Sequence, residues 1–392
     1  MDIFEKCYAD DYIKEMIRNG QYPYFLPLSE NEGNVASYKG KKLIMCGSNN
    51  YLGLTTHPKV REAAIEAIRK YGTSCTGSRY LNGSIELHET LEHEIADFVG
   101  KKASLVFSTG MQVNLGTISA LIGRGDYAVL DKDSHASIYD GVKLSYGKLE
   151  RFSHNDMDHL ERVLQSIPED AGKMIIVDGL FSMEGDLAPL DLLVPIAKKY
   201  GARLMVDDAH GIGVTGGGHG TSAQFGLTDE VDLIMSTFSK SFASLGGFIA
   251  GDTDVVQYIK HHARSMIFSA SIQPASTAAA LAALRIMVAE PEWNAKLIHN
   301  GEKMRKGFRD LGFNIGNSVT PIIPILIGDN DKTFEMAQGL FENGVFVNSV
   351  ISPATPPGRQ LLRTSYMATH TEEQLDQVLD TFKVVGKKVG LI

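Results

Sequence analysis

The sequence has few cysteines and no long apolar run. Three cysteines, Cys7, Cys46 and Cys75, are widely spaced among 392 residues. This argues against a disulfide framework or a cysteine-ligated metal site, and favours a reducing compartment. A run of about 18 apolar residues, as a membrane-spanning helix needs, is absent. The nearest candidate, residues 275–289, is rich in alanine and contains Arg285, so it predicts a buried helix.

The sequence also lacks a basic segment. The formal net charge is -9 and no basic stripe or arm is present, so nucleic acid is a poor candidate partner. The N-terminal segment is acidic and helical in pattern, unlike a signal peptide. With 43% hydrophobic and 22% charged residues, the composition predicts a soluble, cytoplasmic, globular protein.

The chain length predicts two or three structural units. Residues 1–45 read as a helix, an aromatic segment and short strands. Residues 46–275 alternate apolar strand candidates with helical stretches, which predicts a doubly wound, mainly parallel α/β sheet. The strand candidates are Ser104–Phe107, Tyr127–Leu130, Met174–Val177, Arg203–Val206, Asp232–Met235 and Phe248–Ala250. The last follows its predecessor so closely that we expect it to pair antiparallel.

Residues 276–392 predict a smaller α+β unit at the C-terminus. It opens with a long helix and continues with strand candidates at Ile322–Ile327, Val345–Val347 and Leu361–Tyr366. A proline-rich loop, 352–358, precedes the last strand, and an amphipathic helix, Glu372–Val385, closes the chain.

Polar side chains follow two of the predicted buried strands. Lys240 comes just after one strand, while Asp207 and His210 follow another. Open α/β sheets bind ligands at the carboxyl ends of their strands. A buried lysine is suited to imine formation because burial lowers its pKa, and an acid nearby could keep a pyridine nitrogen protonated. The pair indicates pyridoxal 5'-phosphate (PLP), although a surface lysine and a packing histidine are the alternative interpretations.

A second group of motifs could hold a phosphate. Residues 108–114 read as a strand end, a glycine turn and a helix start, which offers backbone amides to an anion. An ordinary βα turn would look the same. Thr237 and Ser239, beside Lys240, add hydroxyl groups suited to a phosphate.

Other candidates have weaker patterns. His135 could stack on a flat ring, Ser182 could meet a cofactor or a substrate carboxylate, and Arg363 could grip a carboxylate bidentately. A structural histidine, a capped turn and an internal salt bridge are the respective alternatives. The glycines at 211–216 match a dinucleotide fingerprint, but no helix follows them. The histidines lack metal-ligand spacing, so we predict no metal site.

Taken together, the motifs resemble those of the α-oxoamine synthases, PLP enzymes of fold type I that join an amino acid to an acyl-CoA with loss of CO2. The resemblance covers nearly the whole chain. The motifs that carry it are Ser48-Asn-Asn-Tyr-Leu-Gly53, Gly77-Ser-Arg79, Ser108-Thr-Gly110, Asp133-Ser-His135, Asp207-Asp-Ala-His-Gly211, Thr237-Phe-Ser-Lys240, Ser269-Ala-Ser271 and Leu362-Arg-Thr-Ser365.

The resemblance implies a fold like that of aspartate aminotransferase and a role for each matching residue. Lys240 would hold PLP as an imine and move the α-proton, Asp207 would pair with the pyridine nitrogen, and His135 and His210 would contact the ring and its phenolic oxygen. The remaining implied ligands are Thr237, Ser239, Gly110 and Met111 for the phosphate, Asn49, Ser182 and Arg363 for the substrate carboxylate, and Ser269 for the phosphate of a partner subunit. The last role implies a homodimer with shared active sites.

Within this family, residues 22–25, 237–241 and 353–356 look most like members that use L-serine and a long-chain acyl-CoA. The expected reaction gives 3-oxosphinganine, the first step of sphingolipid synthesis. The alternatives are 2-amino-3-ketobutyrate CoA ligase, 8-amino-7-oxononanoate synthase and a non-catalytic partner subunit. An insoluble product makes peripheral contact with the inner membrane face plausible.

Overall fold

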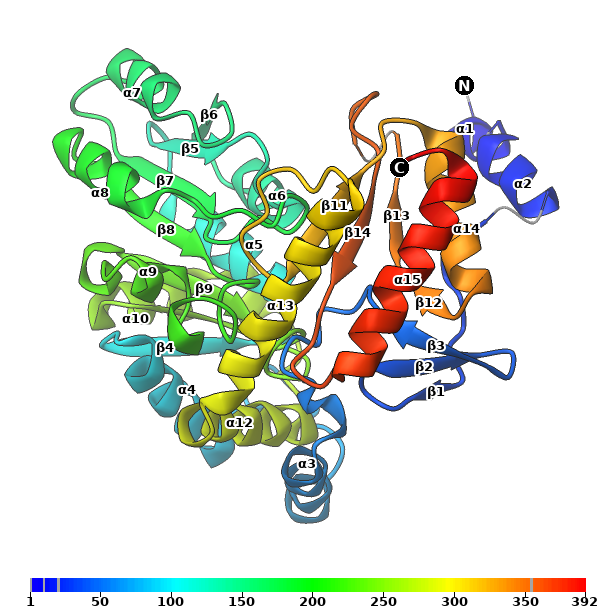
Figure 1. The fold of residues 1–392 in the computed structure, drawn as a ribbon. Coiled ribbons are helices and arrows are strands. Elements are labelled where there is room, and N and C mark those ends of the chain that lie inside the picture. Colours follow the sequence, from blue (N-terminus) through cyan, green and yellow to red (C-terminus); the bar gives the residue numbers. More distant parts are fainter. Residues whose placement is uncertain (1, 10, 20–21, 353–354) are drawn as a thin grey trace.

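The structure, a computed structural model, describes residues 2–9, 11–19, 22–352 and 355–392, so Pro353 and Ala354 of the predicted loop lie outside the described residues. Its centre is a seven-stranded sheet in the order β4-β10-β9-β8-β7-β5-β6 (Figure 1). The strands are β4 (Ala103–Phe107), β5 (Tyr127–Asp131), β6 (Lys148–Phe152), β7 (Lys173–Asp178), β8 (Arg203–Asp207), β9 (Leu233–Thr237) and β10 (Gly247–Gly251). Only β10 runs antiparallel to its neighbours, which confirms the predicted mixed α/β sheet.

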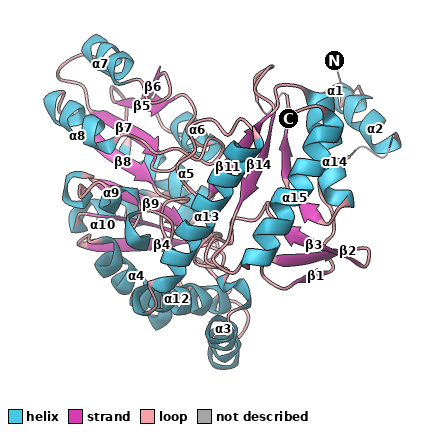
Figure 2. Ribbon diagram, viewed as in Figure 1, coloured by secondary structure: helices cyan, strands magenta, loops and turns pink. Residues whose placement is uncertain are grey.

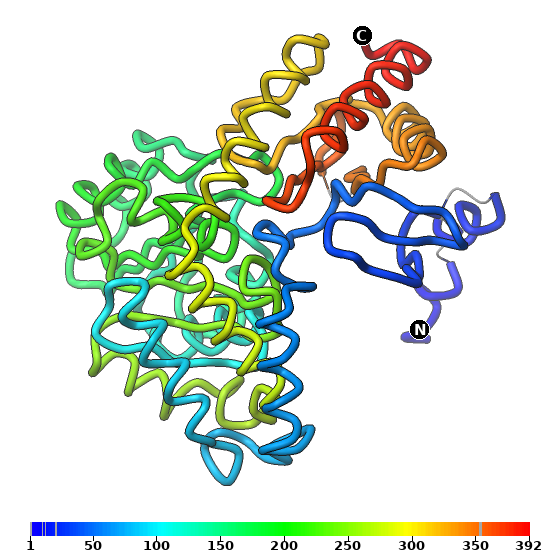
Figure 3. The backbone as a smooth tube through the Cα atoms, turned by 60° about the horizontal axis from the view of Figure 1, so that its bottom comes forward, coloured from blue at the N-terminus to red at the C-terminus, as the bar shows by residue number. Residues whose placement is uncertain are grey.

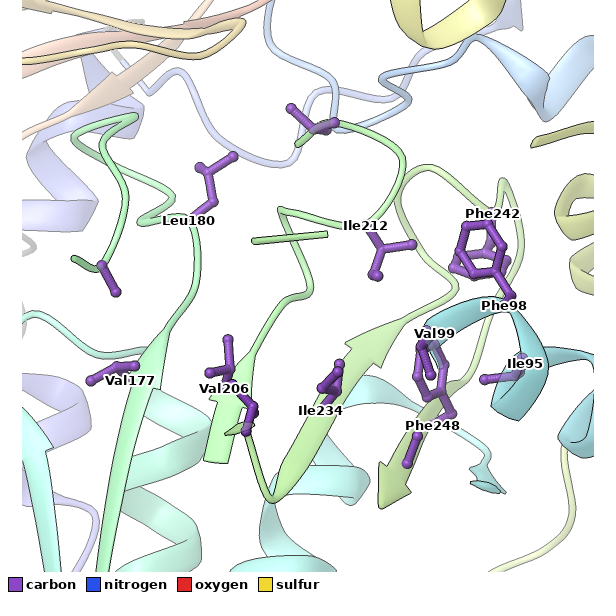
Figure 4. Close-up of a cluster of buried hydrophobic side chains, with 14 of the residues drawn as sticks. Ile95, Phe98, Val99, Val177, Leu180, Val206, Ile212, Ile234, Phe242 and Phe248 are labelled. Carbon is purple, nitrogen blue, oxygen red and sulfur yellow. The ribbon is translucent and has the colours of Figure 1, made fainter. Parts of the chain in front are cut away.

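The central strands are apolar on both faces. Val177, Val206 and Ile234, from β7, β8 and β9, belong to one hydrophobic core, which Figure 4 shows beside helix α4. Their neighbours in sequence, such as Met205, belong to the core on the opposite face. Successive side chains of a strand point to opposite faces. The strands of a parallel sheet that is covered on both sides are therefore continuous apolar runs, and such runs can be predicted from the sequence.

Helices cover both faces of this sheet (Figure 2). The core on the first face is covered by α3 (Pro58–Tyr71), α4 (Glu86–Val99), α7 (Met157–Ser166), α8 (Leu190–Lys199) and α12 (Pro274–Ala289), and Leu297 of α13 (Glu292–Leu311) joins it. The helices on the opposite face are α5 (Gly110–Leu121), α6 (Ala136–Leu144), α10 (Thr253–His262) and α11 (Arg264–Ile267). The short helix α9 (Thr221–Gln224) lies between β8 and β9. None of the described helices combines the length and apolar composition needed to cross a membrane.

The C-terminal part forms a separate core around an antiparallel sheet in the order β11-β14-β13. Its elements are α13 (Glu292–Leu311), β11 (Ile322–Leu326), α14 (Asn330–Glu342), β12 (Val345–Phe346), β13 (Asn348–Val350), β14 (Leu361–Ser365) and α15 (Glu372–Val389). Helix α15 begins with a capping box between Thr371 and Gln374, which fixes its first turn.

The N-terminal segment packs beside this C-terminal part (Figure 3). It contains α1 (Glu5–Tyr8), α2 (Asp11–Arg18), β1 (Glu30–Asn31), β2 (Val35–Tyr38) and β3 (Lys41–Met45). Strand β3 pairs in parallel with β12, so the two ends of the chain share a sheet in the order β1-β2-β3-β12. Ile44 and Cys46 enter the C-terminal core.

Besides the two-residue strand β1, the strands β6 and β13 were not predicted. Strand β6 is the edge strand beyond β5, and its sequence, Lys-Leu-Glu-Arg-Phe, keeps only Phe152 fully buried. Strand β13 has three half-buried residues. A short edge strand has one solvated side and needs little apolar surface, so hydrophobic patterning does not reveal it.

The parallel pairing brings the carboxyl ends of the strands to one edge of the sheet. Asp178, Asp207 and Thr237 are the last residues of β7, β8 and β9. Asp178 pairs with Asp207 in register, and Asp207 pairs with Met235. Three strands thus deliver polar side chains to one place from positions about 30 residues apart in the sequence.

Candidate active site

A cavity of about 240 Å³ opens at this edge of the sheet. Eight of the predicted site residues line it: Gly110, Met111, His135, Asp207, His210, Thr237, Ser239 and Lys240. They come from four connections that follow β4, β5, β8 and β9. The structure therefore brings together residues that the sequence separates by 130 positions.

One end of the cavity is formed by the start of α5 and by Thr237. A Cβ on Gly110 would lie 2.7 Å from Thr237 Oγ1, so only glycine lets the helix start approach β9 this closely. Thr237 Oγ1 lies 2.9 Å from Ser239 Oγ. The amides of Gly110 and Met111 belong to the first helical turn and have no intrahelical acceptor. Thr237 Oγ1 also donates to the Gly246 carbonyl at 2.9 Å, so the free donors that this end of the cavity offers to an anion are the two amides.

Asp207 lies at the buried base of the cavity. Its Oδ2 accepts a hydrogen bond of 2.7 Å from Asn114 Nδ2, and its Oδ1 accepts one of 3.1 Å from the Ala209 amide. Asn114 also donates to Ser137 Oγ at 2.8 Å, and that hydroxyl lies 2.7 Å from Nδ1 of His135. The acid and the ring-stacking candidate are thus fixed by one hydrogen-bonded network.

Burial changes the protonation of the groups around Lys240. Burial lowers the pKa of Lys240 to about 8, although Asp207 and Asp178 oppose the shift. Burial also lowers the pKa of His210 well below its usual value, and the positive charges of Lys240 and Arg363 add to this. Burial, with repulsion from Asp207, raises the pKa of Asp178 well above its usual value. Near neutral pH, the lysine has an accessible free amine and His210 is a neutral imidazole.

A second cluster surrounds Arg363, which is buried in β14. Its Nε donates to the Ser182 carbonyl at 2.6 Å, and its Nη2 donates to Asn49 Oδ1 at 3.0 Å. The predicted carboxylate-binding residues therefore meet, with Ser182 contributing its backbone carbonyl. Nη2 also lies 3.3 Å from the Tyr51 hydroxyl, which is 2.6 Å from His210 Nδ1. Tyr51 joins this cluster to the cavity.

Ser269 lies apart from both clusters. It is absent from the cavity lining, and its hydroxyl accepts a hydrogen bond of 2.8 Å from Gln112 Nε2. Its predicted contact with a partner subunit stays a prediction, as does a ligand contact through the Ser182 hydroxyl.

Sequence reasoning assigned no role to Tyr51, Asn114 or Asp178. Tyr51 is part of the Asn-Asn-Tyr-Leu-Gly motif, and Asp178 directly follows a predicted strand, so both carried a signal. Asn114 lies in the second turn of α5 and had none. Its contact with Asp207 exists only because α5 packs against the sheet next to β8.

Behind the His135 and Ser182 loops, His154 lies between two acids. Its Nδ1 is 3.1 Å from Asp131 Oδ1, and its Nε2 is 3.1 Å from Asp186 Oδ2. A neutral imidazole can donate from only one nitrogen, so this geometry requires the cation. Burial opposes the charge of His154, but the hydrogen bonds that it donates to both acids outweigh burial and raise the pKa of His154 to about 10.

Asp131, Asp133 and His154 form a group in which each side chain has one possible metal-ligand atom within 4.8 Å of the others. Nδ1 of His154 already donates to Asp131 of this group, and Nε2 donates to Asp186 outside it. His154 therefore ties the loop after β5, which carries His135, to the loop after β7, which carries Ser182.

A cavity at the carboxyl edge of a mainly parallel sheet, with a buried lysine and acid, defines an enzyme of the fold-type I PLP class. The chain belongs to the family of class I and II aminotransferases, whose model matches residues 41–382. Its fold and family are those of the α-oxoamine synthase type of PLP enzyme.

The most informative relatives are serine palmitoyltransferases (SPT). The chain is 50% identical to the one from Sphingobacterium spiritivorum over 380 residues, covering 97% of this chain and 95% of the relative. A solved structure of SPT with PLP superposes with a TM-score of 0.96 at 36% identity, covering both chains completely. The 8-amino-7-oxononanoate synthase of Alkaliphilus oremlandii is 41% identical over the full length of both chains.

The lowered pKa of Lys240 predicts how the apoprotein takes up PLP. Only the free amine forms an imine, so the uptake rate should fall about tenfold per pH unit below pH 8. Stopped-flow absorbance of PLP mixed with apoprotein between pH 6 and 10 measures this. Lys240→Ala is the control and should show no imine absorbance. A midpoint near the ordinary lysine pKa would contradict the prediction.

We expect His154→Gln to destabilise the protein by roughly 3 kcal/mol, because two buried acids lose their shared cation. Folding raises the pKa of His154. Its contribution to the free energy of unfolding is therefore complete at pH values below the pKa that it has in the unfolded chain. The deficit of the variant should therefore shrink as the pH rises toward about 10. Urea unfolding at several pH values tests this. The exposed pair His93–Asp97 supplies the control, and His93→Gln should cost little. A deficit that does not change with pH would refute the cationic assignment.

Proposed function

We propose that this protein condenses L-serine with a long-chain acyl-CoA, palmitoyl-CoA in the simplest case, to give 3-oxosphinganine, CoA and CO2. One observation carries the proposal: Lys240 and Asp207 share a cavity that Tyr51 connects to Arg363. An imine-forming amine, a partner for a pyridine nitrogen and a carboxylate grip thus occupy one site. Identity of about 50% to SPT along nearly the whole chain supports this substrate pair.

The residues of the cavity fit PLP. The approach of Gly110 to Thr237 leaves free amide donors where a phosphate would lie. Asp207 is buried, and each of its carboxylate oxygens accepts one hydrogen bond, from Asn114 or from the Ala209 amide. This environment suits a carboxylate that faces a protonated ring nitrogen. When bound, PLP supplies an electron sink that stabilises negative charge at the α-carbon of an amino acid.

The residues of the chain then have distinct tasks. Lys240 would hold the cofactor through its amine and move the proton at the α-carbon of serine. Asp207 would keep the pyridine nitrogen protonated, and His135 would cover the ring face. His210 would donate a hydrogen bond to the phenolic oxygen. Arg363 and Asn49 would orient the serine carboxylate, the group that is later lost as CO2.

The same reasoning supports proposals about assembly and location. We propose a homodimer in which Ser269 reaches the phosphate site of the partner subunit. We also propose a cytoplasmic protein that contacts the inner membrane face peripherally, because the long-chain product is insoluble in water. The division of the chain into three units, at residues 45 and 275, stays a prediction. Strand β3 of the first unit pairs with β12 of the third, so these two units share a sheet.

An absorbance titration of the holoenzyme tests the function directly. L-serine, rather than glycine or L-alanine, should shift the cofactor spectrum, and CoA release should then follow only with palmitoyl-CoA. A response to L-alanine with a pimeloyl thioester would favour the 8-amino-7-oxononanoate synthase reaction, and one to glycine with acetyl-CoA would favour the 2-amino-3-ketobutyrate ligase reaction. The absence of any cofactor spectrum would favour a non-catalytic subunit.

Arg363→Lys should raise the serine KM by about 100-fold, because an ammonium cannot replace the fixed fork of the guanidinium. Steady-state kinetics with serine as the varied substrate measures the change. The acyl-CoA KM is the internal control and should stay within about threefold, since a charged hydrogen bond is lost only toward serine. An unchanged serine KM would move the carboxylate site elsewhere.

A further inference from the structure

The hydroxyl group of Tyr51 lies where the cofactor and substrate halves of the site meet. The side chain is fully buried, in the connection between β3 and the helical turn Leu54–Thr56. Its oxygen is 2.6 Å from His210 Nδ1, 3.3 Å from Arg363 Nη2 and 3.2 Å from Asn49 Oδ1. Burial raises the pKa of Tyr51, against the influence of Arg363, so the phenol keeps its proton.

The proton of this phenol has two possible acceptors, and the geometry favours one. Arg363 can only donate, so it donates to the Tyr51 oxygen. Asn49 Oδ1 lies 3.2 Å from the Tyr51 oxygen, whereas His210 Nδ1 lies at 2.6 Å. The guanidinium polarises the phenol and makes it a stronger donor. The short contact with His210 is therefore the hydrogen bond that Tyr51 donates.

We propose that Tyr51 is a positioning residue that holds His210 in the tautomer with its proton on Nε2. A neutral imidazole has one N–H, and Nδ1 is used as the acceptor of the Tyr51 proton. His210 lines the cavity, so Nε2–H is the donor left for a ligand there. The identity of that acceptor, the phenolic oxygen of PLP, rests on the proposed function. The tautomer itself does not.

The same chain of hydrogen bonds links substrate binding to the cofactor. The charge of Arg363 strengthens the donor Tyr51, which in turn strengthens the Nε2–H of His210. A serine carboxylate bound at Arg363 would neutralise that charge. His210 would then bind the phenolic oxygen less strongly once serine is in place.

Nitrogen NMR of the apoprotein labelled with ¹⁵N-histidine tests the tautomer. The His210 signals are identified by their absence in His210→Gln. In the wild-type protein we expect a protonated Nε2 and an unprotonated Nδ1. In Tyr51→Phe the preference should be lost. The matched control is Tyr366→Phe, which removes a hydroxyl that is equally buried and makes no hydrogen bond to His210, and it should leave the His210 signals unchanged.

Kinetics of the holoenzyme supply the second measurement. Tyr51→Phe should lower kcat about tenfold, the effect of one hydrogen bond, while the serine KM stays within about threefold because Ser182 and Asn49 still hold Arg363. A protonated Nδ1 in the wild-type protein would overturn the proposal. So would unchanged His210 signals in Tyr51→Phe together with a raised serine KM, which would reduce Tyr51 to a support for Arg363. The NMR result uses no substrate, so it stands even if the serine reaction fails.

Discussion

The parallel pairing of β7, β8 and β9 is the constraint on which the site depends. It sets Asp178 beside Asp207 and places the connection that carries Lys240 next to both. Two carboxyl groups and an amine buried together cannot all keep their ordinary charges. The pKa of Asp178 is raised and the pKa of Lys240 is lowered. Asp207 instead accepts two hydrogen bonds, from Asn114 and from the Ala209 amide.

A second constraint is the close approach of backbones at the phosphate end of the cavity. Strand β10 lies between β4 and β9, so the end of β4 is held one strand away from Thr237. A Cβ on Gly247 would lie 2.9 Å from the Gly110 Cα, and a Cβ on Gly110 would strike Thr237. Two glycines thus let a helix start and a strand end come together at the place where the phosphate is proposed to bind.

The residues proposed to bind the substrate are positioned by the smaller sheets at the two ends of the chain. Arg363 belongs to β14, and Asn49 and Tyr51 follow β3, so the sheets at the two ends of the chain position them. Hydrogen bonds through Ser182 and Tyr51 connect these residues to the central sheet. Tyr51 is thus the hydrogen-bonded link between His210 in the cavity and Arg363.

The sequence by itself determined the buried strands, the helices between them and most cavity residues, because a strand buried on both faces must be apolar and its polar end is then conspicuous. It left β6 and β13 unmarked, since edge strands need little apolar surface. The contact of Asn114 with Asp207, the bridging of two acids by His154 and the position of Tyr51 were decided only by tertiary structure. Each is a hydrogen bond between distant segments, and local patterning contains no information about which polar groups packing will bring within 3 Å of one another.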